Sequence, residues 1–190
     1  MKLNLLTKGN LKISKTVGIF DLPTSVCRSS CEKCYAKKAE KMYKNVLPKR
    51  NRNLEATLRD SFIEEMSNEI TISKIKAFRL HSSGDFYSQD YIDKWIKIIN
   101  KHPDIKFYAY TKAKGYKDLS FKKIEKLKNF NLINSVTPLG VNYGSKEYCD
   151  KLVKEYGYTL CPCAPGKHVS CGDECTLCVE KNKMICFLQH

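Results

Sequence analysis

Hydrophobic and polar positions along the chain predict short strands separated by longer amphipathic segments. Apolar residues in residues 11–20 favour a strand or hairpin, which the turn Asp21, Leu22, Pro23 closes. Four further short apolar runs, each next to polar or turn-forming residues, predict strands at residues 75–80, 105–110, 132–136 and 158–160.

The segments between these strands have the composition and periodicity of helices. High helix propensity predicts one helix over residues 35–46, which Pro48 ends, and a second over residues 54–70. Further helices are expected at residues 88–102, 119–130 and 146–155. Strands that alternate with crossover helices indicate right-handed βαβ units, so the fold class expected is α/β with parallel strands.

The chain shows no segment that would cross a membrane. It has 190 residues, and no apolar run approaches the length of about 18 that a spanning helix needs. The N-terminal residues contain only a short apolar patch, which is too little for a secretory signal. We therefore expect a soluble, cytoplasmic protein with no membrane partner.

The charge balance is strongly basic. Lysine and arginine total 34 against 20 acidic residues, a net charge of +14 that favours a polyanionic partner such as nucleic acid. Only five of these cations are arginines, the residue that phosphate and base readers prefer. An AT-rich genome would give the same lysine-rich composition, so both interpretations stay open.

Ten cysteines require a chemical explanation. Three form a tight group at the N-terminal end, six crowd the last 30 residues, and Cys149 stands alone in a helical pattern that suits a small buried side chain. A disulfide framework would be spread more evenly and belongs to an oxidising compartment. Metal ligation is therefore the favoured interpretation.

The motif CxxxCxxC occurs twice, as Cys27, Cys31, Cys34 and as Cys171, Cys175, Cys178. Three thiolates at this spacing can hold three corners of an iron–sulfur cubane and leave the fourth iron without a local ligand. A closed zinc site would have to recruit a fourth ligand from elsewhere in the chain.

The first motif, directly after the first predicted strand, resembles the hallmark of the radical S-adenosylmethionine (radical SAM) superfamily. That resemblance implies a partial (β/α) barrel, a [4Fe–4S] cluster, S-adenosylmethionine as cofactor and an external electron donor. Lys33 stands where many members carry an aromatic residue, and Tyr35 follows the motif instead. The layout of most of the chain also resembles a family of phage gene products, a resemblance that supplies no activity.

Three further segments are candidates for cofactor binding. The superfamily resemblance implies that the turn Ser83, Gly84, Asp85 holds the methionine ammonium of the cofactor; taken alone, it is a turn before a helix. Tyr35, Thr111 and Lys112 are added as cofactor-binding candidates, although Lys112 also suits a solvated loop. His81 is either a ligand or a hydrogen-bonded structural residue.

The C-terminal cysteines predict a second metal site. Cys171, Cys175 and Cys178 would be joined by Cys161 as the fourth ligand, with Cys163 and Cys186 as alternatives. The site would hold an auxiliary [4Fe–4S] cluster or a structural zinc ion. We therefore expect a partial barrel over residues 1–157 and a cysteine-rich extension over residues 158–190.

Two function hypotheses follow from these features. The first is a minimal radical SAM enzyme that cleaves S-adenosylmethionine reductively and generates a 5′-deoxyadenosyl radical on an unidentified substrate, either nucleic acid or protein, with no catalytic residue assigned. The alternative is a non-catalytic zinc protein that binds nucleic acid. Its basic face would consist of Lys112, Lys114, Lys117, Lys122, Lys123, Lys126 and Lys128.

Overall fold

The computed structural model describes residues 4–29, 31, 34–163 and 169–188. Its main sheet has five strands in the order β1-β2-β3-β4-β5. The hairpin strand β1 (Thr7–Lys8) runs antiparallel to β2 (Val17–Phe20), and all later pairs in this sheet are parallel. These later strands are β3 (Ala77–Leu80), β4 (Lys106–Thr111) and β5 (Phe130–Asn134).

Helices connect the parallel strands. A short 3-10 turn, η1 (Thr24–Val26), and three helices, α1 (Tyr35–Met42), α2 (Val46–Leu58) and α3 (Phe62–Ser73), lie between β2 and β3. Helix α4 (Gln89–Lys101) joins β3 to β4, and Ser88 caps it by accepting a hydrogen bond from the Tyr91 N–H. The connection from β4 to β5 holds η2 (Ala113–Gly115) and the single-turn α5 (Lys122–Glu125).

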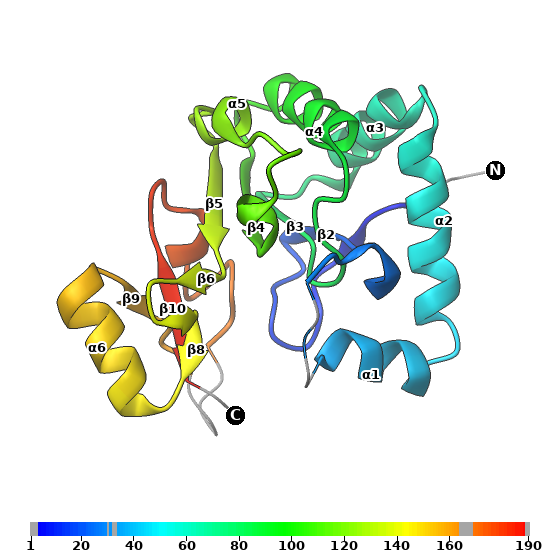
Figure 1. Cartoon of the computed structure of the whole chain (residues 1–190). Coiled ribbons are helices and arrows are strands. Elements are labelled where there is room, and N and C mark those ends of the chain that lie inside the picture. The colour runs from blue at the N-terminus through cyan, green and yellow to red at the C-terminus, as the bar shows by residue number, and fades with distance from the viewer. Residues whose placement is uncertain (1–3, 30, 32–33, 164–168, 189–190) are drawn as a thin grey trace.

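The core lies between the sheet and the helices α2 to α5, which Figure 1 shows along one side of the strands. Phe20 packs against Trp95 of α4 with ring centroids 5.5 Å apart, and both side chains are completely buried. The opposite face of the sheet carries Val17, Ile19 and Tyr108, and the cysteine-rich C-terminal segment packs against it.

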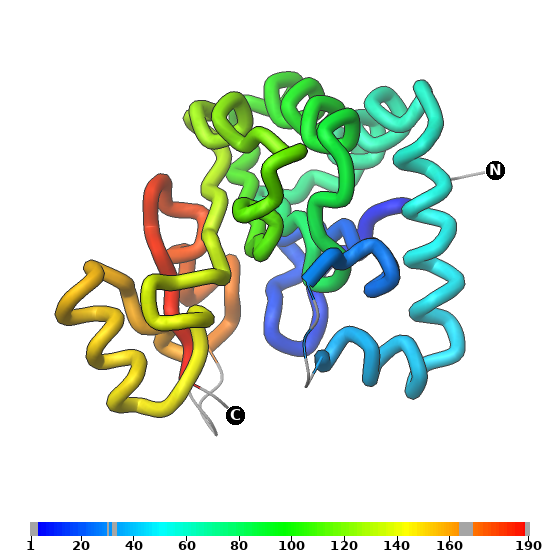
Figure 2. Tube along the Cα trace, in the orientation of Figure 1, coloured from blue at the N-terminus to red at the C-terminus, as the bar shows by residue number. Residues whose placement is uncertain are grey.

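The C-terminal part forms a small unit beside β5 (Figures 1 and 2). A two-stranded sheet, β6 (Val136–Thr137) and β7 (Gly140–Val141), leads into β8 (Tyr143–Gly144) and α6 (Lys146–Tyr156). The last strand, β10 (Ile185–Leu188), lies between β8 and β9 (Thr159–Leu160) and is parallel to both. The 3-10 turn η3 (Leu177–Val179) packs against β4 and β5.

The α/β class with parallel strands is confirmed, and the partial (β/α) barrel stays a prediction, because the structure shows no barrel closure. The sheet remains open, with β1 at one edge and β5 at the other. The last predicted strand, residues 158–160, does not extend this sheet, because β9 pairs with β10 through Thr159 and Ile185. The cysteine-rich extension is present, and the boundary at residue 157 stays a prediction.

Three predicted helix boundaries were wrong. Pro48 lies in the first turn of α2 and does not end a helix, because the N–H that proline lacks has no intrahelical partner there. The helix expected over residues 54–70 is broken, because α2 ends at Leu58 and α3 begins at Phe62 with Ser61 as its N-cap residue. The helix expected over residues 119–130 is reduced to α5, since the Lys181 ammonium group binds the carbonyls of Glu125 and Leu127.

Candidate metal centre

The carboxyl ends of β2, β3 and β4 bring the predicted site residues to one edge of the sheet. The three strands are parallel neighbours, with Phe20 opposite Leu80 and Leu80 opposite Ala109. The loop after β2 carries Cys27, Cys31 and Cys34, the loop after β3 carries Ser83, Gly84 and Asp85, and β4 ends at Thr111 and Lys112.

In the first cysteine group, Cys31 and Cys34 lie close enough to Cys27 to raise its pKa. Burial raises the pKa of Cys27 to about 11, and Asp85, Cys34 and Cys31 raise it further, whereas a hydrogen bond from the Gly84 N–H opposes the shift. Without a bound cation, Cys27 is therefore a protonated thiol at neutral pH. Cys34 is the N-cap residue of α1, where the helix dipole favours negative charge.

Lys112 connects β4 to the first cysteine group. Its ammonium nitrogen lies 3.2 Å from the Cys31 sulfur, and its backbone N–H donates to Asp85 over 2.9 Å. Lys112 is thus a contact of the cysteine group and not a solvated loop residue.

Both oxygens of the Asp85 carboxylate are occupied by protein donors. One accepts the Thr111 hydroxyl over 2.6 Å and the Phe86 N–H over 2.8 Å, and the other accepts the Lys112 N–H. Burial raises the pKa of Asp85, while these hydrogen bonds act in the opposite direction. Asp85 therefore fixes the end of β4 relative to the loop after β3.

Gly84 is required at its position for two reasons. Its φ is +82°, in the region that residues with a side chain rarely adopt, and a Cβ there would lie 2.5 Å from the Leu22 Cβ. The contact is tight because the loops after β2 and β3 are bonded together. The Leu22 N–H donates to the Ser83 carbonyl, and the Ser83 hydroxyl donates to the Leu22 carbonyl.

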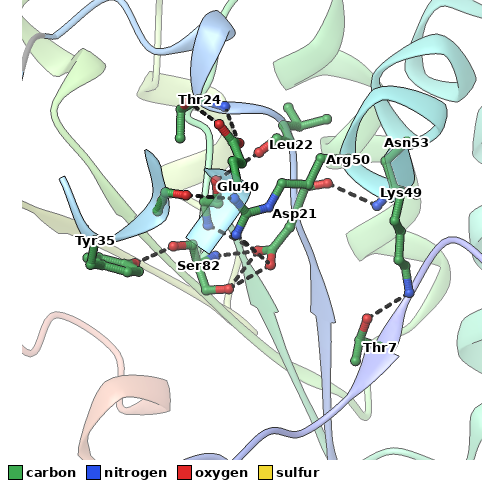
Figure 3. Close-up of polar contacts among 12 residues, drawn as sticks. Thr7, Asp21, Leu22, Thr24, Tyr35, Glu40, Lys49, Arg50, Asn53 and Ser82 are labelled. Carbon is green, nitrogen blue, oxygen red and sulfur yellow. Dashed lines mark hydrogen bonds and ion pairs between the residues drawn. The ribbon is translucent and has the colours of Figure 1, made fainter. Parts of the chain in front are cut away.

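A network of buried charges anchors both ends of the cysteine loop (Figure 3). Asp21, at the start of the loop, accepts hydrogen bonds from the backbone N–H groups of Ser82 and Ser83. Arg50 of α2 forms an ion pair of 3.0 Å with Glu40 of α1. Glu40 in turn accepts the N–H and the hydroxyl of Thr24.

Tyr35, the residue after Cys34, reaches across to the loop after β3. Its hydroxyl donates to the Ser82 carbonyl, while 66% of the residue stays exposed (Figure 3). His81 is buried beneath this loop, and its Nε2 atom lies 2.8 Å from the Tyr91 hydroxyl. Burial and the charge of Arg79 lower the His81 pKa to about 3, so His81 is a neutral structural residue.

The C-terminal cysteines form a second group on the face of the sheet opposite the helices. Burial raises the pKa of Cys161 to about 11, and the neighbouring thiols Cys178, Cys171 and Cys163 raise it further. Burial and Cys175 raise the pKa of Cys178 in the same way. The predicted ligands Cys161, Cys171, Cys175 and Cys178 thus lie together, and Cys163 lies with them.

The sheet and the N-terminal hairpin hold this second group. Cys171 forms β-bridges with Ile13 and with Cys175. The Tyr110 hydroxyl lies 2.9 Å from the Cys178 sulfur, and the Asn131 side chain donates to the Cys178 carbonyl.

Cys186 and Cys149 belong to a separate apolar cluster. Both are completely buried, together with Leu152, between α6 and β10. The expectation that Cys149 is a small buried side chain is confirmed. Burial raises the pKa of Cys186 to about 12, and Cys149 contributes more to this rise than Cys161 does.

Sequence reasoning missed Arg79 of β3. Its guanidinium lies 5.5 Å from the centre of the Tyr110 ring, and its charge lowers the pKa of both Cys171 and Cys178. Its Nε atom is buried and has no hydrogen-bond partner among the described residues. The signal was a charged residue in a strand whose Phe78 and Leu80 face the core, since alternation places Arg79 on the opposite face.

Within the described residues, no three histidine, cysteine or acidic side chains are arranged to hold a single metal ion. In the same part of the chain, none of the helices is both long and apolar enough to cross a membrane.

Comparison with known proteins assigns the chain to a family. The sequence model of a family described as Gene product 88 matches residues 4–155. The chain belongs to the Gene product 88 family. The matched region includes Cys27, Cys31 and Cys34 and ends before the second cysteine group.

Two curated relatives are phage proteins of the same name. The Gene 88 protein of Mycobacterium phage D29 is 31% identical over 157 residues, which cover 72% of this chain and 64% of the relative. The Gene 88 protein of Mycobacterium phage L5 is 31% identical over 128 residues, covering 57% of this chain and 53% of the relative. The chain thus spans between half and two thirds of the relatives it matches, and no solved structure matches it.

Membership of Gene product 88 corrects the first of the two resemblances. The CxxxCxxC motif suggested the radical SAM superfamily, but the family that matches is Gene product 88, and that assignment was therefore wrong. The resemblance to a family of phage gene products is confirmed.

Proposed function

We propose that this chain is an iron–sulfur protein in which Cys27, Cys31 and Cys34 hold a [4Fe–4S] cluster with one open iron. The observation that carries the proposal is the contact between Lys112 and Cys31 at the edge of the sheet where the three thiols gather. The proposal rests on this donor set and not on membership of a superfamily. Three thiolates suit three corners of a cluster.

Several side chains would support such a cluster. The Lys112 ammonium group offsets negative charge on Cys31, and the Gly84 N–H donates to the Cys27 sulfur. Charges and hydrogen bonds at cluster sulfurs raise the reduction potential, so both contacts favour the reduced state. The network of Asp21, Arg50 and Glu40 would keep the loop in place while the cluster changes its charge.

The open iron is proposed to bind S-adenosylmethionine. A cluster with this ligand supplies one-electron cleavage of the sulfonium and a 5′-deoxyadenosyl radical, with electrons from an external donor. The backbone at Ser83 and Gly84, the Asp85 carboxylate and the polar groups of Tyr35, Thr111 and Lys112 surround the cysteine loop and would contact this cofactor. Because Asp85 already accepts three protein hydrogen bonds, it would orient Lys112 as well as the cofactor.

The second cysteine group is proposed to hold a structural centre, a [4Fe–4S] cluster or zinc. Cys161, Cys171, Cys175 and Cys178 are its ligands, with Cys163 adjacent. The buried Arg79, whose Nε atom lacks a partner in the described part of the chain, suits a site that becomes negative when thiolates bind metal.

Spectroscopy of anaerobically purified protein tests this function. We expect about four iron and four sulfide per first cluster, and an electron paramagnetic resonance signal of the reduced protein that shifts when S-adenosylmethionine is added. Asp85→Asn should weaken S-adenosylmethionine binding by about 1 to 3 kcal/mol while the iron content stays the same. A colourless protein that contains only zinc would contradict the proposal.

A further inference from the structure

Helix α1 presents a row of lysines that begins at the first cysteine group. Cys34, Lys37, Lys38 and Lys41 are spaced at i, i+3, i+4 and i+7, so they share one face of the helix. Together with Met42 they line a surface pocket of about 550 Å³. The three lysines are exposed, and none forms an ion pair with another described residue.

Among the residues that the structure describes, no acidic side chain lines this pocket. Glu40, the one acidic residue of α1, points inward and is held by Arg50 and Thr24, with 10% of its side chain exposed. The inner face of α1 is therefore bonded to the rest of the protein through Glu40, and the charged side chains on its outer face are all lysines.

The basic face predicted from sequence, around η2 and α5, differs from α1 because acidic side chains lie next to its lysines. Lys114 of η2 forms an ion pair with Glu125 of α5, and Lys123 of α5 lines a pocket together with Asp93 and Asp118. Positive charge there is partly neutralised by acidic neighbours. The lysines of α1 are thus the better match for a polyanion.

Exposed apolar and aromatic residues follow the lysines. Met42 and Tyr43, at the end of α1, expose 57% and 58% of their surface. Lysines that bind phosphates next to an exposed aromatic ring that can stack on a base are the features of a site for single-stranded nucleic acid.

We propose that the face of α1 formed by Lys37, Lys38 and Lys41 binds the phosphate backbone of a single-stranded nucleic acid and leads it to Cys34. This deepens the proposed function, because it identifies the substrate class and the direction from which the substrate reaches the cluster. The surface itself requires no metal, so the two proposals can be tested separately.

Fluorescence anisotropy with a labelled oligothymidylate of about 20 nucleotides tests this surface on the metal-loaded chain of 190 residues. Replacing Lys37, Lys38 and Lys41 together with Gln should weaken binding at least tenfold at about 50 mM salt. The slope of log K against log salt should fall by about two, since each phosphate contact on a single strand contributes about 0.7. Tyr43→Ala should weaken binding about fivefold or more.

The control variant replaces Lys122, Lys123 and Lys126 with Gln, which removes the same number of charges at the same spacing from α5 and its C-cap residue. It should bind as the wild type does. Equal losses in both triple variants, or no loss in the α1 variant, would overturn the proposal. Competition by polyglutamate as strong as by unlabelled oligonucleotide would also overturn it, because the surface would then be one for acidic peptides.

The test of the docking surface is separate from the test of the cluster, because oligonucleotide binding and iron content are measured independently. Suppose that the wild type contains no iron, binds the oligonucleotide, and loses this binding in the α1 variant. This result would contradict the proposed function and leave the docking surface intact. A protein that contains the cluster but binds oligonucleotide equally well with and without the three lysines would contradict the docking surface alone.

Discussion

The Lys112 ammonium nitrogen lies 3.2 Å from the Cys31 sulfur, although 81 positions separate the two residues in the chain. The contact exists because Asp85 holds the Lys112 backbone where β4 ends next to β3. It links the cysteine loop directly to the end of β4.

Lys112→Met should lower the reduction potential of the first cluster, because it removes a positive charge from beside a ligand sulfur. The expected change is on the order of 40 mV, or about 1 kcal/mol for one electron. A potentiometric titration followed by electron paramagnetic resonance measures it. Lys114→Met, which removes a lysine paired with Glu125, is the control and should leave the potential unchanged. Equal potentials in Lys112→Met and the wild type would show that Lys112 does not act on a cluster.

Gly84→Ala should destabilise the protein by about 2 to 4 kcal/mol, because the new Cβ would collide with Leu22 at a φ of +82°. Urea unfolding gives the free energy. Gly115→Ala is the matched control, since a Cβ there would meet no atom within 4 Å, and its unfolding free energy should change little. A stable Gly84→Ala protein would mean that the loops after β2 and β3 are not held this closely.

Arg50→Met should cost about 3 kcal/mol or more of unfolding free energy, because it leaves Glu40 buried without its partner. Arg52→Met, an exposed position on the same helix, should change stability by less than about 0.5 kcal/mol. Similar stability of the two variants would show that the buried ion pair does not anchor the loop.

The Glu40 carboxylate should make the free energy of unfolding depend on pH. Burial raises the pKa of Glu40, but the hydrogen bonds from Thr24 and the charge of Arg50 outweigh it and place the pKa below the ordinary 4.5. The stabilisation is therefore complete above pH 4.5 and is lost as the pH falls through the lower folded-state pKa. Glu40→Gln should unfold with a weaker pH dependence in this acid range than the wild type.

Replacing Cys171 and Cys178 with Ser should make the C-terminal segment sensitive to protease. Strand β10 is held by apolar burial, with Ile185 and Cys186 completely buried, whereas residues 169–176 precede it and would gain folding free energy from a metal bound there. Limited proteolysis with mass spectrometry locates the cleavage, which we expect after residue 160 and not in residues 62–134. Unchanged resistance would exclude a structural centre at these cysteines.

The fold could be predicted where the signal is local. Helix α4 was expected from its apolar periodicity and from Ser88, which does cap it. The parallel order of β2 to β5 followed from the alternation of strands and helices. Whether this open sheet curves as a partial barrel could not be predicted, because curvature depends on how separate strands and helices pack and not on any local pattern.

In the candidate site, too, some features could be predicted from the sequence and others could not. The gathering of Cys27, Gly84 and Lys112 followed from their positions at the ends of parallel strands. The partners of Arg50 and the orphaned nitrogen of Arg79 could not be read from sequence, since they arise where separate elements pack. For Arg79 the only advance signal was a charged residue in a strand whose neighbours Phe78 and Leu80 face the core.

The most direct test of the iron–sulfur account is the iron and acid-labile sulfide content of protein purified without oxygen. Replacing Cys27, Cys31 and Cys34 together with Ala should remove about four iron atoms per chain, while Cys149→Ala, which lies outside both cysteine groups, should retain them. Iron content in the triple variant equal to that of the wild type would contradict the account.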